Sequence, residues 1–245
     1  MAETNKPVQI LFTAFEATPF IKTGGLGDVA GSLPPVIRTA KYDIRVILPL
    51  HSAIPENYRA KMRFIKHYNV PLSWRKQYCG LFELEHNGII FYFLDNEYYF
   101  RRAGIYGEFD DGERVAFFSK AALETIQHID GFKPSILHCN DWHTALVPVF
   151  LREHYMGLPD YSKIHTVFTI HNLKFQGKYS DYMIDNILGL HRTPAENQLS
   201  EGGSVNYLKG AVLYSDLITT VSPTYAAEIC TPYFGEGTTD RKSVV

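Results

Sequence analysis

The sequence predicts an α/β fold of three layers, in which a mostly parallel sheet with a small antiparallel insertion lies between helices. The first observation is that apolar runs of strand length alternate with segments whose apolar residues recur at helical spacing. The second is that 245 residues, of which 45% are hydrophobic, suffice to bury a sizeable core. The third is the absence of internal repeats, low-complexity tracts and long linkers, which makes a single domain the simplest division.

The N-terminal segment predicts a parallel strand–helix–strand unit. Val8–Ala14 is an apolar run of strand length, and the apolar positions of Val29–Ala40 suit a helix packed on a sheet. Ile44–Leu50 then predicts a second strand. Because such crossovers are right-handed, the two strands are expected to lie parallel in one sheet.

A glycine-rich stretch, Lys22 to Val29, joins the first strand to the helix. Gly24, Gly25 and Gly27 lack a Cβ, so a ligand can approach the backbone closely. The N–H groups that open the helix and the Lys22 ammonium both favour an anion such as a phosphate. The stretch lacks the Gly-Lys-Ser/Thr ending of a Walker loop and the spacing of a dinucleotide fingerprint. On the glycines alone, two interpretations have equal weight: a phosphate-binding loop and a plain tight turn.

An antiparallel insertion is expected next. Met62–Trp74 and Gln77–Glu85 alternate loosely as strands, and a turn at 86–88 precedes the aromatic strand Ile89–Leu94. The pattern then gives way to a long loop, Asp95–Gly112, rich in Tyr, Arg, Gly and Asp. A loop of this length in a compact domain is a candidate binding loop, and the alternative is an ordinary surface loop.

The second half of the chain predicts further strand–helix units. Strands are expected at Pro134–Cys139, Ile164–Ile170 and Leu217–Val221, each an apolar run followed by polar residues. Helical spacing predicts helices at Glu113–Ile129, Thr144–Met156, Asp181–Leu190 and Val205–Ser215. Strands that alternate with helices in this way form a parallel sheet.

Polar side chains follow these strands at their carboxyl ends, where ligands bind in parallel α/β sheets. Asp141, Trp142 and His143 follow one strand, and His171 and Asn172 follow the next. Taken singly, such a histidine is more often structural, the aspartate can cap the next helix, and the tryptophan can belong to the core. Their convergence with the glycine-rich stretch predicts a pocket for a phosphate and a polyhydroxyl group, without a metal triad or a nucleophile elbow.

Composition and cysteine usage narrow the class of protein. A formal net charge of −2 argues against a surface that coats a polyanion, so nucleic acid is not an expected partner. Cys79, Cys139 and Cys230 are odd in number and far apart, which predicts free thiols and neither a disulfide framework nor a zinc site. The polar N-terminus and the shortness of the apolar runs predict a cytoplasmic protein without a membrane span.

Four motifs, taken together and in this order, resemble the N-terminal half of bacterial glycogen synthases and plant starch synthases. They are Lys22-Thr-Gly-Gly-Leu-Gly-Asp28-Val, His138-x-x-Asp141-Trp142-His143, Thr169-Ile-His171-Asn172-Leu and Thr220-Val-Ser222-Pro-Thr-Tyr-Ala. The resemblance spans residues 8–237 and implies a GT-B architecture, in which two Rossmann-like domains face each other across a cleft. It also implies transfer of glucose from ADP-glucose, or UDP-glucose in some relatives, to the non-reducing end of an α-1,4-glucan with retention of configuration, and no cofactor besides the substrate.

The resemblance assigns roles to individual residues. Lys22, Gly24 and Gly25 would lie near the diphosphate, Asp28 would support the loop or the acceptor side, and Tyr106 would match the tyrosine of the family's substrate loop. The transferred glucose would be surrounded by Asp141, His143, His171 and Asn172, with Trp142 also among the substrate-binding residues. The implied mechanism is same-face attack by the acceptor hydroxyl on an oxocarbenium-like centre, stabilised by protein dipoles. His171 would hydrogen-bond the sugar and place its backbone carbonyl near the anomeric carbon, without acting as a general base.

The sequence departs from the family pattern at its end. Family members continue past residues 232–235 into a linker and a second domain that carries an Arg/Lys pair and a glutamate, and neither follows here. We therefore expect a domain at 1–237 and a tail at 238–245 outside the family. Residues 240–245 match the translation of a common sequencing adapter, which indicates a truncation artefact; the alternatives are a deliberately shortened or a naturally short protein.

The missing second half predicts that this chain alone folds and is catalytically inactive. Two other classes stay open: a stand-alone glucan-binding module, and a different GT-B glycosyltransferase of the sucrose-synthase or trehalose-forming type. The glycine-rich stretch and Asp141-Trp142-His143 favour α-glucan synthesis over the latter. The sequence leaves the oligomeric state open.

Overall fold

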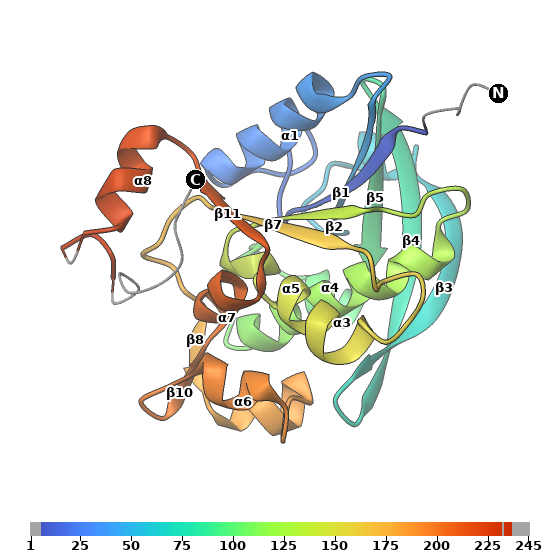
Figure 1. Cartoon of the computed structure of the whole chain (residues 1–245). Helices are drawn as coiled ribbons and strands as arrows, with labels where there is room; N and C mark the ends of the chain where they lie inside the picture. Colours follow the sequence, from blue (N-terminus) through green and yellow to red (C-terminus); the bar gives the residue numbers. More distant parts are fainter. Residues whose placement is uncertain (1–5, 232, 237–245) are drawn as a thin grey trace.

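The chain is built around an eight-stranded sheet, with strand order β11-β7-β6-β1-β2-β5-β4-β3. The computed structural model describes residues 6–231 and 233–236, and Figure 1 shows the sheet running through the middle of the molecule. Its strands are β1 (Val8–Thr13), β2 (Tyr42–Pro49), β3 (Arg63–Leu72), β4 (Arg75–His86), β5 (Ile89–Asp95), β6 (Ile136–Asn140), β7 (His165–Ile170) and β11 (Leu217–Thr220). From β11 to β5 the neighbours are parallel, and β4 and β3 continue the sheet antiparallel. The predicted fold class is confirmed.

Helices cover both faces of the sheet. They are α1 (Gly25–Ile37), α2 (Glu56–Arg59), α3 (Glu97–Phe100), α4 (Asp111–Thr125), α5 (Leu146–Phe150), α6 (Pro194–Leu199), α7 (Tyr207–Tyr214) and α8 (Pro223–Ile229). Figure 1 shows α1 on one side of the central strands and α4, α5 and α7 on the other. A π-helix, Leu151–Tyr155, continues α5. The helix predicted over 144–156 therefore consists of an α-helical segment followed by a π-helical one.

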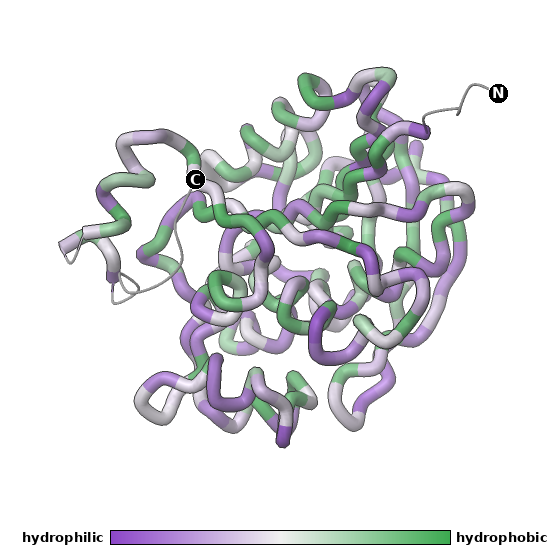
Figure 2. The backbone as a smooth tube through the Cα atoms, viewed as in Figure 1, coloured by the Kyte–Doolittle hydropathy of each residue, from purple (hydrophilic) through white to green (hydrophobic). Residues whose placement is uncertain are grey.

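The alternation of side chains along the strands divides the core in two. Leu11 and Ile47 point to a large cluster beneath α4, α5 and α7, whereas Phe12 and Val46, one position away, point to a smaller cluster beneath α1. This is the period of two expected where a sheet is buried on both faces. Figure 2 shows the hydrophobic residues gathered along the central strands and the hydrophilic ones on the surrounding loops. No helix in the described ranges is long and apolar enough to cross a bilayer.

Two elements begin earlier than predicted. Helix α1 starts at Gly25, so only residues 22–24 of the glycine-rich stretch precede the helix, and the rest of the stretch forms its first turn. The predicted loop over 95–112 contains α3, because the Asn96 side chain accepts a hydrogen bond from Tyr99 N at 3.1 Å and caps it. Helix α4 then starts at Asp111, which shortens the loop at its other end.

A small second sheet, which was not predicted, forms between β7 and α7; it overlaps a predicted helix only at residues 205–206. Strands β8 (Lys178–Ser180), β9 (Ser200–Glu201) and β10 (Ser204–Asn206) pair in the order β8-β10-β9. The predicted helix over 181–190 is a short π-helix, Ile184–Leu188. The predicted helix over 205–215 begins only at residue 207, because Asn206 ends β10 and caps α7 by accepting a hydrogen bond from Lys209 N at 3.0 Å.

Candidate active site

The carboxyl ends of β1, β6 and β7 open onto a cavity of about 830 Å³. It brings together every predicted site residue except Lys22 and Asp28. The lining residues are Glu16, Thr23, Gly24, Gly25, Leu26, Val29, Tyr106, Gly107, Asp111, Asp141, Trp142, His143, His171, Asn172, Phe175 and Val221. A cavity of this size lies within the range of roughly 300–1,000 Å³ that is usual for small-molecule sites.

Lys22 and Asp28 pair with each other beside this cavity. The Lys22 ammonium lies 2.6 Å from the Asp28 carboxylate, and both side chains are about half exposed, at 46% and 57%. Neither residue lines the cavity. An exposed pair of this kind contributes little to stability, so the ammonium can exchange its partner at small cost. The predicted contact of Lys22 with a diphosphate therefore stays a prediction.

The glycine-rich stretch presents the N-terminus of α1 to the cavity. Gly24 is the N-cap residue, and no side chain caps the first turn. The uncapped N–H groups and the helix dipole favour an anion at this point. The stretch is held from beneath by Glu16, whose buried carboxylate accepts hydrogen bonds from Thr23 N and, at 2.9 Å, from Thr23 Oγ1.

Aromatic rings form one wall. The Tyr106 ring stacks on His143 with 4.4 Å between ring centroids, and Trp142 lies against His143 at 4.2 Å. Phe15 stacks on the same imidazole at 5.3 Å. Burial among these rings lowers the pKa of His143 well below its usual value, and the positive charge of Arg114 acts in the same direction. His143 is therefore a neutral side chain in the wall.

A buried ion pair anchors the loop that carries Tyr106. Asp111 Oδ2 accepts a hydrogen bond from Gly107 N at 2.7 Å, and Asp111 Oδ1 accepts one from Arg114 Nη1. The Arg114 side chain is completely buried, and its Nε donates to Tyr99 O at 2.7 Å. The position of Tyr106 over His143 thus depends on the contacts that Asp111 and Arg114, both in α4, make with the loop and with Tyr99.

A hydrogen-bond chain fixes the tautomer of His171. Asn140 Nδ2 donates to Thr13 O at 3.1 Å and to His138 O at 3.2 Å, so its Oδ1 is left to accept. His171 Nε2 lies 3.0 Å from that oxygen and must carry the hydrogen. Burial lowers the pKa of His171 to about 4. At neutral pH the imidazole is uncharged, its Nδ1 can accept a hydrogen bond, and it is too weak a base to remove a proton from a hydroxyl.

Asp141 combines a strained backbone with a perturbed carboxyl group. Its φ of 60° lies in the left-handed region, which is rare for a residue other than glycine. Burial raises the pKa of its carboxyl group to about 7, against the opposing effect of the backbone N–H groups of Trp142, Asn172 and His171. Its Oδ1 has no hydrogen-bond partner within the described part of the chain. Backbone strain and an unsatisfied buried oxygen at one position are typical of functional sites, and the role assigned to Asp141 stays a prediction.

Several lining residues were not predicted, namely Glu16, Thr23, Leu26, Val29, Gly107, Asp111, Phe175 and Val221. Glu16 follows the first predicted strand by two positions, so the rule applied to the later strand ends would have found it. Asp111 stood inside the 95–112 loop, which was predicted as a candidate binding loop, but nothing in the sequence singled out this residue within it. Across residues 6–231 and 233–236, the His, Cys, Asp and Glu side chains form no group that could hold a metal ion.

With this sheet order and a cavity at the carboxyl ends of its strands, the chain is one of the Rossmann-like α/β domains. A family model described as "Starch synthase catalytic domain" matches residues 9–241. The chain belongs to that family.

Relatives agree with this assignment. The chain is 53% identical to a glycogen synthase of Desulfitobacterium hafniense and 51% identical to one of Clostridium novyi, over 94% of this chain and 50% and 48% of theirs. The chain thus spans about half the length of the curated relatives it matches. The catalytic domain of Arabidopsis thaliana starch synthase IV, bound to ADP and acarbose, superposes with a TM-score of 0.86 at 30% identity, over 96% of this chain and 49% of that one.

A sucrose-phosphate synthase of Thermosynechococcus elongatus has a TM-score of 0.53 at 12% identity, which shows a shared fold alone.

Proposed function

We propose that this chain is the acceptor-side domain of a retaining glucosyltransferase that moves glucose from ADP-glucose to the non-reducing end of an α-1,4-glucan. The observation that carries the proposal is the cavity itself: a neutral His171, a carboxyl group that titrates near neutrality and an aromatic wall converge beside an uncapped helix N-terminus. The ADP bound to the Arabidopsis starch synthase IV domain supports the choice of nucleotide. The proposal places the enzyme in the cytoplasm.

In the reaction, the bond between the anomeric carbon and the phosphate oxygen breaks, and a bond to an acceptor hydroxyl oxygen forms on the same face of the sugar. The acceptor proton leaves with the phosphate oxygen. His171 Nδ1, fixed by the contact of Nε2 with Asn140, accepts a hydrogen bond from a sugar hydroxyl. Its part is therefore to hold the glucose and to stabilise the developing positive charge, not to take the proton.

The diphosphate is assigned to the N-terminus of α1. Gly24 and Gly25 allow phosphate oxygens to approach the uncapped N–H groups, and Lys22 exchanges Asp28 for the diphosphate when the donor is bound. Asp141 then bonds a hydroxyl of the transferred glucose through its unpartnered Oδ1. Tyr106 closes the site over His143.

A chimaera tests the proposal. Residues 1–236 are fused to the C-terminal half of the Desulfitobacterium hafniense glycogen synthase, which is 53% identical over the shared half, and transfer of labelled glucose from ADP-glucose to glycogen is measured. We expect transfer by the chimaera, a loss of about a hundredfold or more in its His171→Ala variant, and none by the 245-residue chain alone. A folded chimaera that binds ADP-glucose and transfers no glucose would contradict the assignment.

A stand-alone glucan-binding role is the second candidate, because the wall formed by Tyr106, His143 and Trp142 offers flat ring faces to a sugar whether or not transfer follows. The two candidates differ in one measurement. A glucan-binding module gives a chimaera that binds maltohexaose and never turns over, whatever residue occupies position 171.

A further inference from the structure

Three carboxyl groups from the described residues line the cavity at the carboxyl ends of β1, β6 and β7, and they differ in their partners. Both oxygens of Asp111 are occupied, Oδ2 by Gly107 N at 2.7 Å and Oδ1 by Arg114 Nη1. Asp141 Oδ1 is assigned to the transferred glucose. The third carboxyl group belongs to Glu16, which is 2% exposed and which the proposed function does not use.

The two oxygens of Glu16 have different surroundings. Oε2 accepts hydrogen bonds from Thr23 N and, at 2.9 Å, from Thr23 Oγ1. Within residues 6–231 and 233–236 these are the bonds that the Glu16 side chain makes, so Oε1 accepts none there. Oε1 lies 3.9 Å from the point where a Cβ on Gly24, the N-cap of α1, would stand. A buried carboxylate needs hydrogen-bond donors, so this oxygen is suited to a donor group from a ligand in the cavity.

The place of Glu16 beside the start of α1 decides which substrate group it meets. In a retaining transfer the acceptor hydroxyl attacks on the face from which the phosphate leaves, so the acceptor and the diphosphate share one side of the sugar. The diphosphate is assigned to the N-terminus of α1, and Glu16 lies directly beneath the residues that precede this helix. Because a carboxylate repels a phosphate, the suitable partner for Oε1 on this side is a hydroxyl of the acceptor.

We propose that Glu16 binds the acceptor, with Oε1 accepting a hydrogen bond from a hydroxyl next to the attacking one on the terminal glucose of the α-1,4-glucan. The inference rests on the proposed function and deepens it by naming an acceptor-binding residue. A hydroxyl has one hydrogen, and that of the attacking 4-hydroxyl leaves with the phosphate oxygen. The 3-hydroxyl and the 6-hydroxyl are the neighbours that remain for Glu16. Glu16 therefore orients the acceptor and takes no proton.

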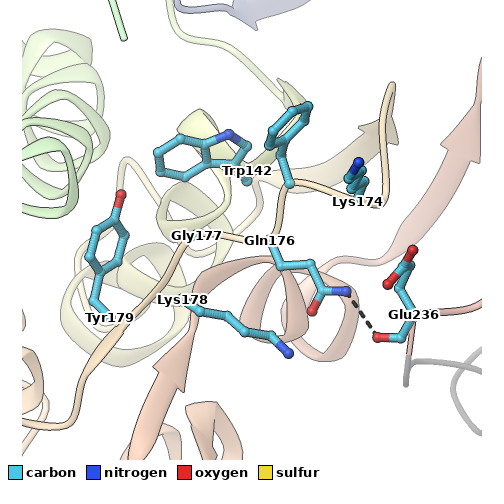
Figure 3. A pocket seen from close by; sticks show the side chains of 8 residues that line it. Trp142, Lys174, Gln176, Gly177, Lys178, Tyr179 and Glu236 are labelled. Atoms are coloured by element: carbon cyan, nitrogen blue, oxygen red, sulfur yellow. Dashed lines mark hydrogen bonds between the residues drawn. The ribbon is translucent and has the colours of Figure 1, made fainter. Parts of the chain in front are cut away.

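Acceptor analogues test the proposal in the 245-residue chain. Trp142 lines both the cavity and the smaller hollow drawn in Figure 3. The chain has two tryptophans, so Trp74→Phe, at a site 74% exposed, leaves Trp142 as the fluorescent reporter. That variant is titrated with maltotriose and with maltotrioses that lack the 3-hydroxyl or the 6-hydroxyl of the glucose at the non-reducing end. We expect maltotriose to bind about tenfold more tightly than one of the two analogues, because the lost hydrogen bond is to a charged group.

Glu16→Gln, introduced into that background, separates the acceptor contact from the support of the glycine-rich stretch. The glutamine oxygen can still accept from Thr23, while its NH2 group faces the cavity as a donor. The preference for maltotriose over the analogue should fall to about twofold or less. The affinity for ADP should stay equal or rise, because a negative charge is removed. Glu124→Gln is the matched control, because Glu124 also accepts a hydrogen bond from a side chain, that of Tyr155, and lies outside the cavity.

The chimaera gives a second measurement of the same contact. There Glu16→Gln should raise the KM for maltotriose about tenfold and leave the KM for ADP-glucose within about twofold. Equal affinities for the three sugars before substitution, or a preference that survives Glu16→Gln, would overturn the inference and leave the proposed function standing. A joint loss of ADP and maltotriose binding would also overturn it, because Glu16 would then only support the glycine-rich stretch. A chimaera that transfers no glucose would count against the proposed function and the inference together.

Discussion

Replacing Arg114 by methionine keeps the length of the side chain and removes the guanidinium that anchors the Tyr106 loop. The loss includes the ion pair with Asp111 and the hydrogen bond from Nε to Tyr99 O. The Arg114 side chain has no exposed surface, and that of Asp111 is 13% exposed. Removing one partner of a buried pair typically costs about 3–5 kcal/mol, because the other charge is left without compensation. Since domains of this kind have total stabilities of about 5–15 kcal/mol, the loss is a large share of the whole.

Urea unfolding of the 245-residue chain measures this cost. With a slope of about 3 kcal/mol per molar, the midpoint should fall by about 1–2 M. The Asp111→Asn/Arg114→Met double variant removes the stranded carboxylate, so its loss should be smaller than the sum of the two single losses by about 1 kcal/mol or more. An Arg114→Met cost below about 1 kcal/mol, or strict additivity in the double variant, would refute the role given to this pair.

Three further substitutions have effects that follow from burial. The pKa of the Asp141 carboxyl is raised to about 7, so the stability of the wild-type chain falls as the pH rises towards 7. Asp141→Asn should therefore be stabilising at pH 8 and nearly neutral at pH 4. A difference in unfolding free energy between variant and wild type that does not change with pH would contradict this. The pKa of Lys120, which is buried against His154, is lowered from 10.5 to about 8, so the stability of the wild-type chain should rise with pH between these values. Lys120→Met should be more stable than the wild type at pH 7, and this advantage should shrink above pH 8. Gly177→Ala should cost about 1–3 kcal/mol and shift the Trp142 emission, because φ is positive and the new Cβ collides with the ring; an unchanged spectrum would argue against that contact.

The strand–helix pattern predicted the sheet and most of the cavity because a parallel sheet gathers the ends of its strands at one edge. Asp141 and His171 stand far apart in sequence, and the rule that brings them together needs only the strand ends. Applied to the end of β1, the same rule would have predicted Glu16 as a residue of the cavity. The φ of Asp141 and the pairing of Lys22 with Asp28 lay beyond that rule, because both depend on side-chain and backbone geometry specific to this packing. Helix α3 was missed because its cap, Asn96, and its buried face, Tyr99 and Phe100, fit into a single turn.

Among the neighbouring strands of the main sheet, β1 and β6 are the pair farthest apart in the sequence. β1 pairs with β2 soon after synthesis, but its other edge is filled by β6, so that Thr13 meets residues 125 positions later in the chain. At about 5–20 residues per second, a ribosome takes roughly 6–25 s to supply that partner. During this interval the central strand of the future sheet has one open edge, and the flank that will carry the site does not yet exist. The order of translation thus makes the active-site half of the sheet the last to close, and nascent chains that stop before β6 should be the ones that associate with each other.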